Sequence, residues 1–174
     1  NNEEAKFRFS LTLFNSKNIE HRYENIKLSE VEPLNENTYD PNFNTPLYDA
    51  VGQGIKNTSE ELKALKTDPN ILFVIMTDGL ENASKEYTRQ AIFKLIKERE
   101  IDGWTFVYLG ANQDAWAIGQ LIGFAQGNTL SYSVADTAAT YNTISYSTID
   151  YVKRISFKGN TSAVADTEFF KKSD

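Results

Sequence analysis

The segment ILFVIMTDG, residues 71–79, constrains the fold of this chain more than any other stretch. Its apolar run before Thr77 is typical of a central strand that helices cover on both faces. The strand ends on the carboxylate of Asp78, and Gly79 lets the backbone turn away sharply. A second apolar run, at residues 103–111, has the same character. Together the two runs predict a buried parallel sheet.

The remaining elements complete an α/β chain. Residues 6–14 alternate apolar and polar side chains and predict a half-buried strand, which pairs with a more polar strand after the turn at 15–18. Asn44 or Thr45 is expected to cap a helix, with Pro46 in its first turn. Further helices are expected at residues 86–100, at 112–124 with Asn112 as the cap, and at 137–154, where a helix is favoured over a strand; a last strand is expected at 129–133.

This order predicts a mostly parallel central sheet with an antiparallel edge hairpin strand and helices on both faces, a Rossmann-like arrangement. The chain has 174 residues, 40% of them hydrophobic, which fits one domain with a sizeable core. It contains no cysteine, so disulfides, zinc–thiolate sites and thiol catalysis are excluded.

Charge and hydropathy limit the partners of the chain. The net charge is −6 without a basic stripe, which argues against binding to nucleic acid. No apolar run reaches the ~18 residues that span a bilayer, and the first residues do not resemble a signal peptide. We therefore expect a cytoplasmic protein that does not bind membranes.

Two loops are expected to meet at the carboxyl edge of the sheet, one carrying Thr45 and the other Asp78. A hydroxyl and a carboxylate are hard oxygen ligands that suit Mg²⁺, Mn²⁺ or Ca²⁺. The simpler alternative makes Thr45 a helix cap and Asp78 a turn residue. Asp49 is expected either to orient the threonine loop or to face solvent. The residues expected to shape the binding surface around the two ligands are Asn44, Gly79, Glu81 and Asn82.

Four blocks of the sequence resemble the von Willebrand factor type A (vWA) domain of bacterial and phage cytoplasmic proteins. They are RFSLTLFNS, NTPLYDAVGQGI, FVIMTDGLENASKEYTRQAI and GWTFVYLGAN, in the order and at the spacing of the family. The resemblance covers residues 1–155 and leaves 156–174 as a C-terminal tail. It implies a metal-ion-dependent adhesion site with Thr45 and Asp78 as ligands, whose shell an acidic group of a protein partner completes.

The sequence departs from the family pattern at its amino-terminal end. The family's Asp-x-Ser-x-Ser ligand loop is absent, and the nearest string, DTAAT from Asp136, has alanine where a ligand is needed. The first strand of the family, expected between residues 6–14 and 71–77, is also missing. Such a slot leaves unpaired backbone groups, so we expect the 174 residues to belong to a longer polypeptide, with a second chain or a rearranged sheet as alternatives. Thr45 and Asp78 alone provide fewer oxygens than the six that Mg²⁺ takes.

Catalysis is not expected. His21, the single histidine, is expected to be an exposed polar residue of the hairpin, and no Ser/His/Asp set can be assembled around it. Asp78 has no second carboxylate at a strand end for metal-assisted chemistry. The sequence therefore favours a protein-interaction module of the vWA type. The alternatives are a metal-free scaffold and a metal-dependent hydrolase.

Overall fold

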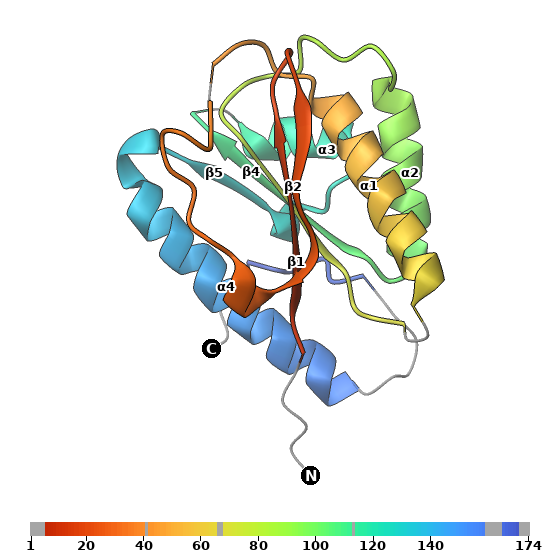
Figure 1. Ribbon diagram of the computed structural model, residues 1–174. Coiled ribbons are helices and arrows are strands. Elements are labelled where there is room, and N and C mark those ends of the chain that lie inside the picture. Colours follow the sequence, from red (N-terminus) through yellow and green to blue (C-terminus); the bar gives the residue numbers. More distant parts are fainter. Residues whose placement is uncertain (1–5, 41, 66–67, 113, 159–164, 171–174) are drawn as a thin grey trace.

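The computed structural model describes residues 6–40, 42–65, 68–112, 114–158 and 165–170, and it has an α/β fold (Figure 1). Strands and helices alternate after an amino-terminal hairpin, as the sequence predicts. The elements in chain order are β1 (Arg8–Phe14), β2 (Ile19–Lys27), α1 (Leu47–Ala64), β3 (Leu72–Thr77), α2 (Arg89–Ile101), β4 (Thr105–Ala111), α3 (Ala115–Leu121), β5 (Thr129–Tyr132) and α4 (Thr137–Lys158).

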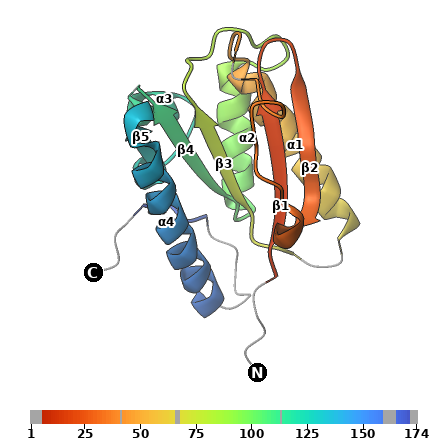
Figure 2. The same cartoon turned by 60° about the vertical axis from the view of Figure 1, so that its left-hand side comes forward.

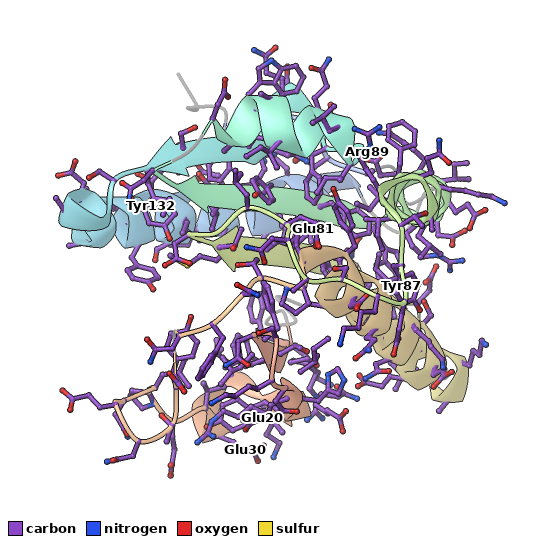
Figure 3. The ribbon with its side chains drawn as sticks, turned by 90° about the horizontal axis from the view of Figure 1, so that it is seen from above. Glu20, Glu30, Glu81, Tyr87, Arg89 and Tyr132 are labelled. Carbon is purple, nitrogen blue, oxygen red and sulfur yellow. The ribbon has the colours of Figure 1, made fainter. Side chains whose placement is uncertain are left out.

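The strands form two separate sheets. β1 and β2 pair antiparallel, and β3, β4 and β5 form a parallel sheet in that order. The β3–β4 register runs from Leu72 opposite Thr105 to Thr77 opposite Gly110. In Figures 2 and 3 the hairpin lies on the β3 side of the parallel sheet. The predicted hairpin and the predicted parallel strands are therefore confirmed, but they are not joined into one sheet.

Helices cover both faces of the parallel sheet. On one face, Ile75 and Phe106 pack with residues of α1 and α2, including Val51 and Ile92. On the other face, Val107 packs against α4 through Tyr151. Every residue of β4 is buried, as expected for a strand between two partners and two helical layers.

β3 differs from the central strand that its sequence predicts. Val74 has 42% of its surface exposed, whereas Val107, its partner on β4, has none. β3 is an edge strand among the described residues, because only β4 pairs with it. Both faces of β3 pack against the core, as predicted, through Phe73 and Ile75 on one face and Leu72 and Met76 on the other. The expectation of a central strand is wrong within the part of the chain described here, because β3 lies at the edge of the parallel sheet.

Two predicted helix caps are also wrong. α1 begins at Leu47 with Pro46 in the cap position, so neither Asn44 nor Thr45 caps it through a side chain. α3 begins at Ala115, and the carboxylate of Asp114, not Asn112, accepts the N–H of Ala117 at 3.0 Å. Residue 112 instead has a positive φ of 54°, which suits the conformational range of asparagine and turns the chain out of β4.

The carboxyl-terminal region is helical, as predicted, and α4 ends at Lys158. The short segment 165–170 packs back onto the domain. The Phe169 side chain has no exposed surface, and its N–H donates to the buried side chain of Asn128 at 2.9 Å. An ion pair of 2.8 Å between Arg154 and Asp166 fastens the same segment to α4. None of the helices in the described ranges is both long and apolar enough to cross a membrane.

Candidate functional site

Reciprocal hydrogen bonds join the threonine loop to the loop that follows β3. The Thr45 N–H donates to Oδ1 of Asn82 at 2.8 Å, and the Asn82 N–H donates to the Thr45 carbonyl at 3.1 Å. Gly79 lies so close that a Cβ atom there would overlap Oγ1 of Thr45. The two loops that the sequence places at the carboxyl edge of the sheet are therefore in direct contact.

Asn44 ties the same loop to the end of the hairpin. Its carbonyl accepts the N–H of Ser16 at 2.9 Å, and its own N–H donates to the Ser16 hydroxyl at 3.3 Å. Ser16 follows β1 by two residues, and Thr45 contacts the loop after β3. Residues 44 and 45 thus connect the carboxyl ends of β1 and β3.

Glu81 organises the loop after β3 (Figure 3). One carboxylate oxygen accepts the N–H groups of Ala83 and Ser84 at 3.0 and 2.8 Å. The other accepts the Ser84 hydroxyl at 2.7 Å and the N–H of Tyr48 at 3.0 Å. The N–H groups of Tyr48 and Asp49 also donate to the Ser84 hydroxyl, so the loop satisfies the first turn of α1 in place of a local cap.

Asp49 has a role that the sequence did not suggest. Its side chain is 6% exposed and accepts three backbone N–H groups, from Lys85 at 2.7 Å, Glu86 at 2.9 Å and Tyr87 at 2.8 Å. It neither faces solvent nor orients the threonine loop. It fastens the segment that leads into α2 against the start of α1, and thereby fixes the far end of the loop that carries Glu81.

Asp78 is exposed at the end of β3, and its charge acts on two tyrosine hydroxyls. Burial raises the pKa of Tyr39, and the negative charge of Asp78 raises it further. The pKa of Tyr132 is also raised, first by burial and then by the charges of Tyr141 and Asp78. These phenols remain neutral hydrogen-bond donors beside the carboxylate at physiological pH.

The turn at Asp78 is set by its neighbours. The Thr77 hydroxyl accepts the N–H of Gly79 at 3.2 Å and donates to the Gly79 carbonyl at 3.1 Å. This local bonding closes the backbone around residue 78, and Asp78 itself is exposed.

The oxygen atoms of Thr45 and Asp78 are of the type that a hard cation binds, but these two side chains do not fill its coordination shell. The Thr45 hydroxyl and the Asp78 carboxylate are oxygen donors, whereas both oxygens of Glu81 are engaged by backbone and hydroxyl donors. In the described ranges, no three His, Cys, Asp or Glu side chains gather as a metal-binding group. Thr45 and Asp78 by themselves supply fewer oxygens than the six that Mg²⁺ takes.

His21 lies apart from this edge and is half-buried, so the expectation of an exposed histidine is wrong. Its Nδ1 is 3.0 Å from the Thr12 hydroxyl, and its Nε2 is 3.0 Å from Nδ2 of Asn57. The ring therefore connects the hairpin to α1.

The sequence suggested two possible roles for Asp49 but not the three N–H groups that it binds. It gave no indication that Ser84, or the tyrosines that interact with Asp78, belong to the site. An acid among the buried residues of α1 was the available signal for Asp49, because a buried carboxylate requires several donors. The contact of Ser84 with the start of α1 and the proximity of Tyr132 to Asp78 carried no local signal, since Tyr48 and Asp49 are far from Ser84 in the sequence and Asp78 is far from Tyr132.

No protein-family model matches the chain, and no curated protein matches it either.

Proposed function

We propose that this protein is a vWA-type protein-interaction module that binds its partner at the carboxyl edge of the parallel sheet. One observation carries the proposal: the threonine loop and the Asp78 loop, distant in sequence, are locked together by the Thr45–Asn82 hydrogen bonds. Such locking fixes a hydroxyl and an exposed carboxylate at the point where open α/β sheets bind ligands. We propose the cytoplasm as its place of action.

A divalent cation, Mg²⁺ or in its place Mn²⁺ or Ca²⁺, would bind at Thr45 and Asp78 when further oxygens complete its shell. When bound, the ion supplies a positive charge that attracts an acidic group of the partner. Asn44 and Asn82 border this point, and Gly79 leaves room for the Thr45 hydroxyl. We propose binding rather than catalysis; in the described ranges no group of three or more His, Cys, Asp or Glu side chains forms around Asp78.

The experiment is a Mn²⁺ titration of the complete polypeptide, followed by electron paramagnetic resonance. We expect saturable binding that Asp78→Ala abolishes while the circular dichroism spectrum stays unchanged. Asp102→Ala is the matched control, because Asp102 is a partly exposed carboxylate that pairs with Arg99 on the surface of α2. Mn²⁺ binding that persists in the Asp78→Ala variant would refute the proposed metal site.

A metal-free scaffold is the second candidate, and the engaged oxygens of Glu81 favour it. In that case the same edge binds its partner through neutral donors such as Tyr39 and Asn82. Partner binding that is insensitive to EDTA but lost on truncation of these side chains would identify the metal-free mode.

A further inference from the structure

We propose that Asp78 and the phenol rings of Tyr39, Tyr132 and Tyr141 form a binding site for the guanidinium group of an arginine side chain in a partner polypeptide. We call these four residues the tyrosine–aspartate site. The inference goes beyond the proposed function and does not rest on it, because the ligand is an organic cation and no metal ion takes part. The two proposals share the carboxylate of Asp78 and are tested apart through their other residues.

The strand register brings Asp78 and Tyr132 into one row across the parallel sheet. Thr77 lies opposite Gly110, so Asp78 follows opposite Ala111, and Ala111 in turn lies opposite Tyr132. Neighbouring strands are ~4.8 Å apart, which puts the backbones of Asp78 and Tyr132 about 10 Å from each other. The side chain between them on β4 is the small methyl group of Ala111. Figure 3 shows Tyr132 close to the ends of the parallel strands.

The row continues the face of the sheet that packs against α4. Met76 on β3 and Leu130 on β5 belong to the apolar cluster on this face, and Tyr132, two residues after Leu130, packs against the same cluster. Asp78 follows Met76 by two residues. Tyr141, near the start of α4, reaches the same place, because its hydroxyl donates to Sδ of Met76 at 3.9 Å. Residues of β3, β5 and α4 therefore meet at this end of the sheet.

The electrostatics of the phenols support this placement and bring in Tyr39, from the loop between β2 and α1. Burial is the largest cause of the raised pKa of Tyr39 and of Tyr132, and the negative charge of Asp78 raises both further. Tyr141 acts on the same two phenols. Each of the charges that act on them raises the pKa, so within the described ranges no lysine or arginine cancels the negative potential at these rings.

The tyrosine–aspartate site is open to solvent. Asp78 is exposed, and Tyr39 and Tyr141 have 43% and 53% of their surfaces exposed. A carboxylate beside aromatic rings attracts a cation through its own charge and through the negative faces of the rings. An anionic group would be repelled by the same charges.

Arginine suits this set of groups better than a compact ammonium ion. The planar guanidinium group stacks on aromatic rings and donates two parallel N–H groups to a carboxylate. The hydroxyl proton of Tyr141 is directed to Met76, which leaves the Tyr141 oxygen as an acceptor for a further N–H group.

The test is an NMR titration of the protein with N-acetyl-arginine amide, in the presence of EDTA. N-acetyl-citrulline amide is the matched probe, because it has nearly the same shape and hydrogen-bonding groups but no charge. We expect saturable shifts of the amide signals of Asp78, Gly79 and Tyr132, with the arginine probe bound about 10-fold more tightly than the citrulline probe.

Three variants assign the binding to the tyrosine–aspartate site. Asp78→Asn keeps the shape of the side chain and removes its charge, so the preference for arginine over citrulline should disappear. Tyr141→Leu removes a ring and should weaken arginine binding several-fold. Tyr146→Leu is the control for Tyr141→Leu, because Tyr146 is also an exposed tyrosine of α4, with 71% of its surface exposed, and this variant should bind arginine as the wild type does.

Equal affinity for the arginine and citrulline probes would overturn the proposal, since recognition of the positive charge is its basis. An absence of saturable shifts with the arginine probe would overturn it too, as would Tyr141→Leu and Tyr146→Leu variants that bind arginine equally well. The Mn²⁺ titration is made without EDTA and without these probes, so failure of either proposal leaves the other standing.

Discussion

The carboxylate of Asp49 gives the most direct test of how the loop after β3 is held. Asp49→Ala removes the acceptor of three backbone N–H groups and leaves the side chains of Lys85, Glu86 and Tyr87 unchanged. Since the site residues Glu81 and Asn82 precede this segment, the variant probes stability and the support of the site together.

The magnitude follows from the surroundings of the three donors. A hydrogen bond to a charged group contributes ~1.5–3 kcal/mol. Three such bonds do not add fully, because Lys85 and Glu86 are exposed and their N–H groups can bind water after the substitution. Only Tyr87 lies in a half-buried position. We therefore expect Asp49→Ala to lower the free energy of unfolding by about 3 kcal/mol.

Asp49→Asn separates hydrogen bonding from volume. The amide keeps one acceptor oxygen, which can serve Glu86 and Tyr87, but its NH₂ group then faces the N–H of Lys85. We expect a loss of about half that of the alanine variant, on the order of 1.5 kcal/mol.

The assay is urea unfolding at 25 °C, followed by circular dichroism, with hydrogen exchange at residues 85–87. Asp102→Ala, which breaks a surface ion pair with Arg99, is the control and should change the unfolding free energy by less than ~0.5 kcal/mol. If Asp49→Ala falls within the same limit and residues 85–87 exchange as in the wild type, then Asp49 does not hold this segment and the reasoning is refuted.

Two further predictions concern the carboxyl-terminal part of the chain. Phe169→Ala should lower the unfolding free energy by about 3–5 kcal/mol, because the ring is fully buried beside Tyr151; a loss below ~1 kcal/mol in urea, close to that of the exposed control Ile101→Ala, would mean that segment 165–170 does not pack as described. Burial raises the pKa of Tyr151, so the folded state holds the phenol proton more tightly than the unfolded state. Its contribution to stability is full below pH ~10 and is lost as pH rises through the folded pKa, with a slope of up to ~1.4 kcal/mol per pH unit. Tyr151→Phe should have a shallower alkaline loss of stability in urea titrations, and identical slopes would contradict the assignment.

Local sequence patterns predicted an element correctly where the apolar pattern of that element alone indicates how it is buried. The run around Phe106 and Val107 predicted a covered strand, and β4 is covered. Residues 137–154 also fit a strand in places, yet the βα rhythm correctly favoured α4. The position of Thr45 and Asp78 at one edge followed from topology, because parallel strands end together.

Partners that are distant in the sequence were not predictable in this way. Ser84 and Glu81 complete the first turn of α1, although Asn44 and Thr45 stand in the local positions for a cap. A cap can be supplied by any donor or acceptor that the fold brings near, so sequence position alone does not select it.

The sequence by itself determined the α/β class, the order of the strands and helices, and the placement of Thr45 and Asp78 in neighbouring loops. These properties depend on apolar periodicity and strand order, which can be read residue by residue. Only the tertiary structure decided that β3 has a free edge, that Glu81 is engaged, and that Asp49 is buried. The reason is physical. An apolar run indicates that a strand favours burial, whereas the segments that pack on the strand and form hydrogen bonds with it are distant in the sequence and cannot be read from the run itself.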